Sequence, residues 1–198
     1  MNKKGTSWYN VGSVSRVEIM VSAALLNAAR GLSNLLERDI TTGTVQARVV
    51  HLGEISSGVG HPEDETVGIY LKMHGDLGGQ ALLILSLEDA LNLADILMEQ
   101  EPGDSSTLEE MAQSALAETG HLMVAYFLNA MAVLTGEALR PSPPAIIVDM
   151  LGSILTVIAA SVGERRDDLM IIETILQDTQ GLFKLRFWVL PDLASQFQ

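Results

Sequence analysis

Hydrophobic residues recur at helical spacing after Ser15. Ser15 and Glu18 have the spacing of a capping box, in which each side chain satisfies a backbone N–H at the start of a helix. With residues placed about 100° apart, the apolar positions fall on one side of a helix. These positions are Val17, Met20, Val21, Ala24, Leu25, Ala28, Leu32, Leu35 and Leu36. The pattern predicts a helix from about Ser15 to Glu37.

The period changes to two after this helix. Apolar and polar residues alternate over Val45–Val49, Val67–Met73 and Ala81–Leu85, which predicts three strands. A stretch with glycines and Pro62 separates the first strand from the second. Asp76–Gly79 has the composition of a hairpin turn between the second and the third.

Two more helix starts follow. Ser86–Asp89 repeats the capping signature and predicts a helix to about Glu99, and Ser106–Glu109 does the same for a long helix to about Thr135. The prolines of Pro141–Pro144 stop any helix there. The remaining predicted elements are an extended Ala145–Val148, a helical Leu151–Val162, and strands over Leu169–Leu176 and Leu182–Val189.

The order helix, strands, helix occurs in both halves of the chain, about 15–100 and about 106–190. A shift of about 99 residues places Leu35 on Leu134 and Ile40 on Leu139. We therefore expect a single α+β domain over residues 1–198, built from two pseudo-symmetric halves. Two unrelated halves that share a common α+β order are the alternative.

Composition narrows the class of protein. Of the 198 residues, 47% are hydrophobic and 19% charged, which is typical of a chain with a packed core. The absence of cysteine excludes disulfides, thiolate metal sites and a cysteine nucleophile. A formal net charge of −13 disfavours nucleic acid and anionic lipid as partners.

The N-terminal sequence lacks the pattern of a signal peptide. Lys3 and Lys4 are followed by the polar stretch Gly5–Ser15 rather than by an apolar block. The longest apolar run, Met150–Val162, is shorter than the roughly 20 residues that cross a bilayer. We expect a cytoplasmic protein without membrane insertion.

The second long helix has a polar pair on its outer side. Its predicted core side comprises Met111, Ala112, Ala115, Leu122, Met123, Tyr126, Ala130 and Val133. The opposite side carries the small residues Ser114, Ala117 and Ala125 together with Glu118 and His121, which are three apart and so adjacent on the helix surface. The alternative is an ordinary solvated pair, worth a few tenths of a kcal/mol.

The first long helix differs on its outer side, which is mainly apolar. Ile19, Ser22 and Leu26 face away from the apolar stripe. We expect a contact surface here for a partner or for a second subunit, which would form a homodimer. The alternative is that the second half of the chain buries this side too.

Other chemistry has little support. His61 beside Glu63–Glu65 suggests an oxygen-ligand metal site, yet such a run is more often a solvated loop, and we expect no metal site. The sequence contains no HExxH, GxSxG, Walker or GxGxxG motif.

Several motifs, in order, resemble the CheC family of chemotaxis proteins, with CheX and the phosphatase-type flagellar switch proteins as its relatives. The matching residues are Ser114–His121, Tyr126, Asn129–Ala130, Leu134–Gly136, Pro141–Pro144 and Val148–Met150, and earlier Gly31–Leu36, Gly75–Gly79, Ala81–Leu85 and Ala90–Leu97. The resemblance covers roughly Val17–Val189. It implies that the halves share one mainly antiparallel sheet, with the two long helices side by side on one face.

The resemblance also implies an activity, the removal of the phosphoryl group from the response regulator CheY. In the family, a glutamate anchors a lysine of the regulator and an asparagine orients the attacking water. The resemblance implies that the protein needs no cofactor of its own, because the regulator is expected to hold the Mg²⁺. The deamidase CheD is a further partner that the resemblance implies.

This chain departs from the family pattern at both sites. At the second site Glu118 is kept, but His121 replaces the asparagine. At the first site, Ile19 and Ser22 stand in place of glutamate and asparagine. We expect binding of a phosphorylated CheY-type regulator with weak dephosphorylation at Glu118 and His121, and with contacts from the small and apolar neighbours. The alternatives are an inactive binding or adapter protein acting through partners such as CheD, and a component of the flagellar switch.

Overall fold

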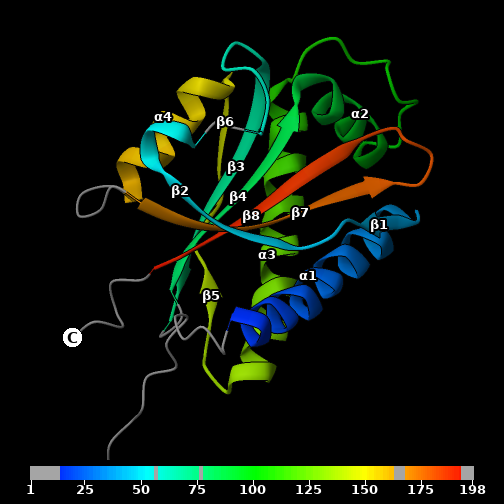
Figure 1. The fold of residues 1–198 in the computed structure, drawn as a ribbon. Coiled ribbons are helices and arrows are strands. Elements are labelled where there is room, and N and C mark those ends of the chain that lie inside the picture. The colour runs from blue at the N-terminus through cyan, green and yellow to red at the C-terminus, as the bar shows by residue number, and fades with distance from the viewer. Residues whose placement is uncertain (1–13, 56–57, 76–77, 163–167, 193–198) are drawn as a thin grey trace, which may run out of the picture.

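The computed structural model describes residues 14–55, 58–75, 78–162 and 168–192 (Figure 1). The helices are α1 (Val14–Leu36), α2 (Leu87–Leu97), α3 (Glu110–Thr135) and α4 (Leu151–Val162), with a short 3₁₀ helix η1 (Leu52–Glu54). The strands are β1 (Ile40–Thr42), β2 (Gln46–His51), β3 (Glu65–His74), β4 (Gly79–Ser86), β5 (Arg140–Pro141), β6 (Ala145–Met150), β7 (Asp168–Asp178) and β8 (Lys184–Pro191). The predicted helices and strands are confirmed, and the short β1 and β5 are additions.

The elements form three layers. One sheet contains all eight strands, α1, α2 and α3 cover one face of it, and α4 covers the other (Figure 1). Between the three helices and the sheet lies a core that includes Leu25, Phe127 and Phe187. Under α4 lies a smaller core around Leu155 and Trp188. Each fully buried side chain of this size stabilises the fold by about 1.5–3 kcal/mol.

The strand order is symmetric about the centre of the sheet. It runs β1-β7-β8-β4-β3-β5, with β2 also on β7 and β6 also on β3, and all pairs are antiparallel. At the centre β4 pairs with β8, where Leu82 lies opposite Trp188. The short strands β1 and β2 of the first half pair with the second half, and β5 and β6 pair with the first. The expected α+β fold of two pseudo-symmetric halves is confirmed.

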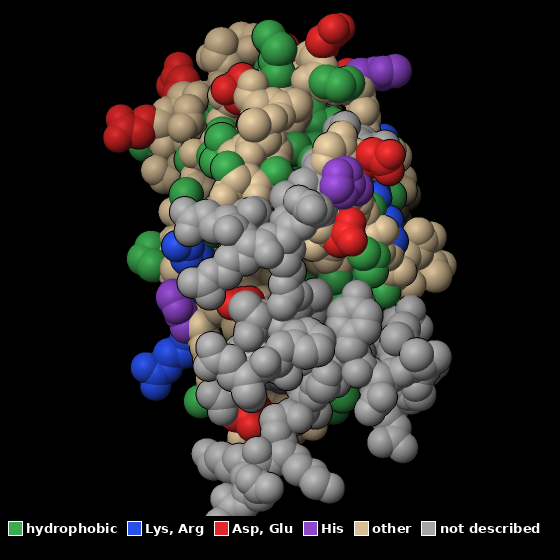
Figure 2. All heavy atoms as spheres, turned by 60° about the vertical axis from the view of Figure 1, so that its left-hand side comes forward, with side chains coloured by type: hydrophobic (Ala, Val, Ile, Leu, Met, Phe, Trp, Pro, Cys, Tyr) green, Lys and Arg blue, Asp and Glu red, His purple; other side chains and the backbone are tan. Residues whose placement is uncertain are grey.

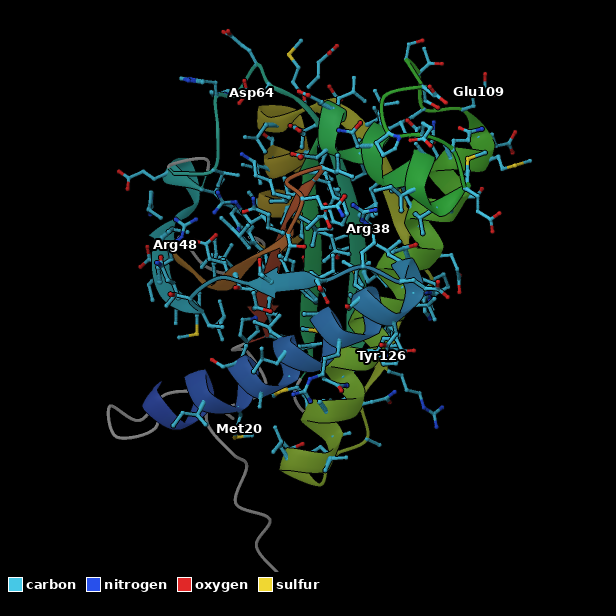
Figure 3. The ribbon with its side chains drawn as sticks, turned by 90° about the vertical axis from the view of Figure 1, so that its right-hand side faces the viewer. Met20, Arg38, Arg48, Asp64, Glu109 and Tyr126 are labelled. Carbon is cyan, nitrogen blue, oxygen red and sulfur yellow. The ribbon has the colours of Figure 1, made fainter. Side chains whose placement is uncertain are left out.

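The two long helices cross near Tyr126. Asn27 Nδ2 donates a hydrogen bond to the backbone oxygen of Tyr126 over 2.8 Å. The Tyr126 ring lies against Gly31, where a Cβ would overlap it. Figure 3 shows the crossing, with Met20 toward one end of α1 and Glu109 at the start of α3, both away from Tyr126. The helices therefore cross around Tyr126, and we call the part of each helix that precedes this crossing its arm.

The predicted core side of α3 is wrong by a rotation of about 100°. Met111, Tyr126 and Val133 were expected inside, but they are 70%, 41% and 85% exposed. The buried side instead includes Ala112, Leu116, Thr119, Gly120, Met123, Val124, Phe127, Leu128 and Met131. Apolar character misled the prediction, because the polar Thr119 and the small Gly120 face the sheet while the large Tyr126 packs on α1.

The predicted helix caps have different outcomes. At α2, Ser86 Oγ accepts a hydrogen bond from the Asp89 backbone N–H over 3.1 Å, as the sequence predicts. At α3 the predicted cap is wrong, because the N-cap residue is Glu109 and it makes no side-chain cap. The helix α1 begins at Val14, and the side chains of Ser15 and Glu18 lie outside the described residues.

One stretch of the described residues, Ile19–Leu36 in α1, is long and apolar enough to cross a membrane by length and composition alone. In the fold it packs against α3 and the sheet, and 44% of it is buried. A core helix of a soluble protein passes the same test.

Candidate functional site

Glu118 and His121 project from the side of α3 that faces away from the sheet. The Glu118 side chain is exposed and His121 is half-buried. Among the described residues, neither side chain makes a hydrogen bond or an ion pair. A carboxylate and an imidazole one turn apart are therefore available to a partner that approaches from solvent.

The backbone under this pair is fixed by close packing. Gly120, between the two residues, lies so near the sheet that a Cβ there would be 2.8 Å from Ile69 Cγ2 and 3.1 Å from Leu83 Cδ1. The Thr119 hydroxyl donates a hydrogen bond to the backbone oxygen of Ala115 over 2.9 Å. A side chain on a helix that is packed closely on a sheet is positioned more accurately than one on a loop.

Small residues surround the pair along α3. Ser114 is exposed, and Ala117 and Ala125 are half-buried. Because none of them reaches beyond the helix backbone by more than a short side chain, the two polar tips stand out from this surface. The arrangement suits contact with another macromolecule. A cavity of about 490 Å³ at the start of α3 is lined by Glu109 and Met111, among others, and does not include Glu118 or His121.

The other predicted contact residues lie on the other arm of the helix crossing. Ile19 is 68% exposed, Leu26 is 48% exposed and Ser22 is half-buried. The alternative in which the second half buries this side of α1 is therefore wrong. Ile19 precedes the Asn27 contact by eight residues, or about 12 Å of helix, and Glu118 precedes Tyr126 by the same distance on α3. The structure does not bring the two sets of residues together.

The loop that contains His61 has a structural role. The Asp64 carboxylate accepts a hydrogen bond from the His61 backbone N–H over 2.7 Å, and the Asp64 and Pro62 carbonyls accept from the first N–H groups of α4. The part of the chain that the structure describes contains no group of three or more His, Asp and Glu side chains that could hold a metal ion. The loop thus caps α4.

Two ionic clusters lie away from the pair. On β7 the buried Glu173 carboxylate accepts hydrogen bonds from Arg48 Nε at 2.9 Å, Arg186 Nη1 at 2.8 Å and Trp188 Nε1 at 2.7 Å. Burial raises the pKa of Glu173, but these donors and positive charges outweigh it and hold the pKa below the ordinary 4.5. This cluster joins three strands of the sheet.

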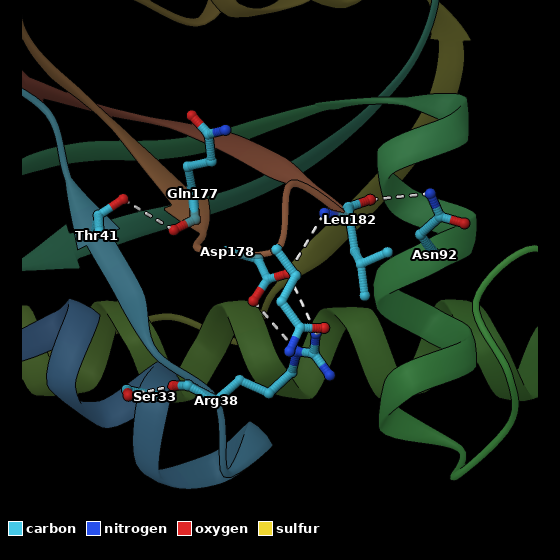
Figure 4. Close-up of polar contacts among 8 residues, drawn as sticks. Ser33, Arg38, Thr41, Asn92, Gln177, Asp178 and Leu182 are labelled. Atoms are coloured by element: carbon cyan, nitrogen blue, oxygen red, sulfur yellow. Dashed lines mark hydrogen bonds and ion pairs between the residues drawn. The ribbon is translucent and has the colours of Figure 1, made fainter.

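The second cluster joins the turn after α1 to the hairpin between β7 and β8. Arg38 donates from Nε and Nη2 to the two oxygens of the buried Asp178 carboxylate, each at 3.2 Å (Figure 4). Arg38 Nη2 also donates to Gln180 Oε1 over 2.6 Å. Asn92 of α2 donates to the Leu182 backbone oxygen of the same hairpin over 2.9 Å. These contacts hold the helix layer on the sheet.

Comparison with known proteins gives a consistent result. No family model matches the chain. It is 27% identical over 173 residues to the CheY-P phosphatase CheC of Bacillus subtilis, covering 85% of this chain and 83% of that protein. Thermotoga maritima FliY has a similar structure, with a TM-score of 0.75 and 22% identity over 92% of this chain and 90% of that one. CheX in the CheX-CheY-BeF3-Mg+2 complex from Borrelia burgdorferi matches at a TM-score of 0.55 and 19% identity, over 85% and 95% of the two chains.

The sheet order, the crossed helices and these structural matches show that the chain has the fold of FliY and CheX. The sequence match shows that the chain is a homologue of CheC. The resemblance found in the sequence motifs is thereby confirmed.

Two features of the site were missed by the sequence prediction. Gly120 sets how closely the helix approaches the sheet, and Gly31 leaves room for the Tyr126 ring on α1. A glycine inside a helical pattern is a signal of close approach, because glycine otherwise weakens a helix. Both glycines carried that signal in the sequence.

Proposed function

We propose that this protein is a chemotaxis protein that binds a phosphorylated CheY-type response regulator through the outer face of α3 and weakly promotes its dephosphorylation. The observation that carries the proposal is the pair Glu118 and His121, which stands free on a rigid, small-residue face of a CheC homologue. The CheY-P phosphatase activity named for the B. subtilis relative supports it.

The two side chains have different parts in this chemistry. The Glu118 carboxylate pairs with a cationic side chain of the regulator and fixes the orientation of the complex. The His121 imidazole hydrogen-bonds the water that attacks phosphorus, in the place where the family has an asparagine amide. Phosphoryl transfer demands mainly positioning and charge stabilisation, so one oriented water can accelerate it. Ser114, Ala117 and Ala125 form the surrounding contact surface.

The activity is weak for a geometric reason. An imidazole is bulkier than an amide, and its donor and acceptor atoms lie in different directions. Misplacement of a water by about 1 Å can cost about a hundredfold in rate. The Mg²⁺ belongs to the regulator, and this chain needs no cofactor of its own.

A second function, an adapter without catalysis, is favoured by one specific observation. Among its described side chains, the equivalent face of α1 has no carboxylate and instead exposes Ile19 and Leu26, with Ser22 between them. Such a face binds a protein partner, for example a CheD-type deamidase or a second copy of the chain, and cannot orient a water as an amide does. A soluble, cytoplasmic location fits both functions.

The decisive experiment mixes the protein with a phosphorylated CheY-type regulator and follows phosphate loss. We expect a modest acceleration that Glu118→Gln and His121→Ala each reduce about tenfold or more, because each removes one of the two contacts. Glu110→Gln on the same helix is the matched carboxylate control and should leave the rate unchanged. Glu110 is exposed and lies two turns before Glu118.

His121→Asn restores the family's residue and should raise the rate. Binding of the phosphorylated regulator is measured in parallel for every variant. Unchanged phosphate loss with retained binding would favour the adapter, and absence of both binding and acceleration would contradict the proposed function.

A further inference from the structure

An exposed apolar strip lies on the edge strand β6. Val148 is 46% exposed and Met150 is 53% exposed. The strand pairs with β3 on one side, and no described strand pairs with its other side. Two large apolar side chains are thus exposed on an unpaired sheet edge, where they add little to the packing of the core.

These side chains lie on the helix-covered face of the sheet. Val148 is opposite Val67 and Ile146 is opposite Ile69, and both partners belong to the core under the helices. Ile146 packs against that core, and Val148 is two residues further along the same face. The strip of Val148 and Met150 is therefore the part of this face that the helices leave uncovered.

The strip borders the flank of α3 that carries His121. Gly120 lies over Ile69 of β3, and Ile146 is the neighbour of Ile69 on β6. Strand spacing and the rise per residue then place Val148 about 10 Å from Ile69. Gly120 faces the sheet. At about 100° per residue, His121 is turned from Gly120 to one flank of the helix and Tyr126 to the other. Because α1 packs on the Tyr126 flank, His121 is on the flank that faces β6.

We propose that Val148 and Met150 form an apolar ledge on which the phosphorylated receiver domain rests when its phosphoryl group reaches Glu118 and His121. This inference rests on the proposed function and extends its contact surface from α3 to the sheet edge. A specific protein interface covers about 800 Å² on each partner, a patch with a radius of roughly 16 Å. A domain of that footprint centred on His121 covers the ledge, which lies well inside this radius.

The first half of the chain supplies a matched control at the position related to Val148 by the pseudo-symmetry. Val49 on β2 is opposite Met170 just as Val148 is opposite Val67, and it is 55% exposed. It is thus the same residue type in the equivalent edge position, beside the helix that lacks the polar pair. A charged residue at Val49 should destabilise the fold as much as one at Val148 does, but it should not contact the bound receiver domain.

The test measures binding of a receiver domain that is activated with beryllofluoride and Mg²⁺. We expect Val148→Asp and Met150→Asp each to weaken binding about tenfold, and Val49→Asp to change it by less than about twofold. Thermal unfolding of all three variants checks that the loss is not a loss of fold. The phosphatase rate at saturating receiver should stay near that of the wild type, because the ledge does not touch the reacting atoms.

Three other outcomes have distinct meanings. Equal binding by wild type and Val148→Asp would overturn the ledge and leave the proposed function standing. A change of oligomeric state in Val148→Asp with unchanged receiver binding would also overturn it, since the strip would then be a contact between copies of the chain. Absence of receiver binding by the wild type would remove both proposals together.

Discussion

His121 and Glu118 show how much of a candidate site can be predicted from the sequence at the scale of single residues. Both could be picked out from spacing alone, because residues three apart share one helix face. Their exposure was also predictable, since small neighbours leave polar tips uncovered. The close approach of Gly120 to Ile69 was not, because it depends on which strand lies beneath the helix.

Glu173 provides a prediction at the residue scale. Its folded pKa is held below the ordinary 4.5, so its ionised form stabilises the fold above that pH and this contribution is lost as the pH falls toward the folded pKa. We expect Glu173→Gln to lower the free energy of unfolding by about 2–3 kcal/mol at pH 7, because two arginines lose their counter-charge.

Urea denaturation at several values between about pH 3 and pH 7 measures this effect. The wild type should lose stability more steeply on the acid side than the Gln variant, so the two curves should converge at low pH. Parallel curves over this range would contradict a stabilising role for the ionised carboxylate.

At the scale of elements, local patterns predicted most of the secondary structure. The alternation over Val67–Met73 and Ala81–Leu85 correctly predicted β3 and β4, and strands were also correctly predicted at β7 and β8. Burial along these four strands does not alternate, because helices cover both faces of the sheet. The predicted core side of α3 was wrong because Tyr126 packs on α1. This is a tertiary contact, so the pattern of residues within α3 does not predict it. Short strands such as β1 and β5 have too few residues to show a period.

The caps of α2 and α3 provide a prediction at this scale. Ser86→Ala should lower the free energy of unfolding by about 1 kcal/mol, because Ser86 Oγ accepts from the Asp89 backbone N–H. Ser106→Ala, at the start that the sequence predicts but the structure does not use, should change it by less than about 0.5 kcal/mol. Chemical denaturation of both variants makes the comparison, and equal losses would show that Ser106 caps α3 after all.

At the scale of the whole molecule, two pseudo-symmetric halves give one fold two unlike helix faces. The repeated order of elements predicts two equivalent halves. It does not predict that β1 and β2 pair with β7 of the second half while β5 and β6 pair with β3 of the first, because this pairing is long-range. Figure 2 shows acidic side chains on the upper part of one face with hydrophobic side chains spread between them, in keeping with a net charge of −13. One arm carries a polar pair and the other exposes apolar residues, so the two arms present surfaces of different chemistry.

The central claim is that the α3 arm, rather than the α1 arm, receives the phosphorylated domain. The chain contains no cysteine, so single-cysteine variants can be labelled at one position each. Ser114→Cys on α3 and Ala23→Cys on α1 place a fluorophore at exposed positions of the two arms. The labelled proteins are titrated with a receiver domain activated by beryllofluoride and Mg²⁺. A saturable change in emission at position 114 with none at position 23 is the predicted result, and a change at position 23 with none at position 114 would contradict the account.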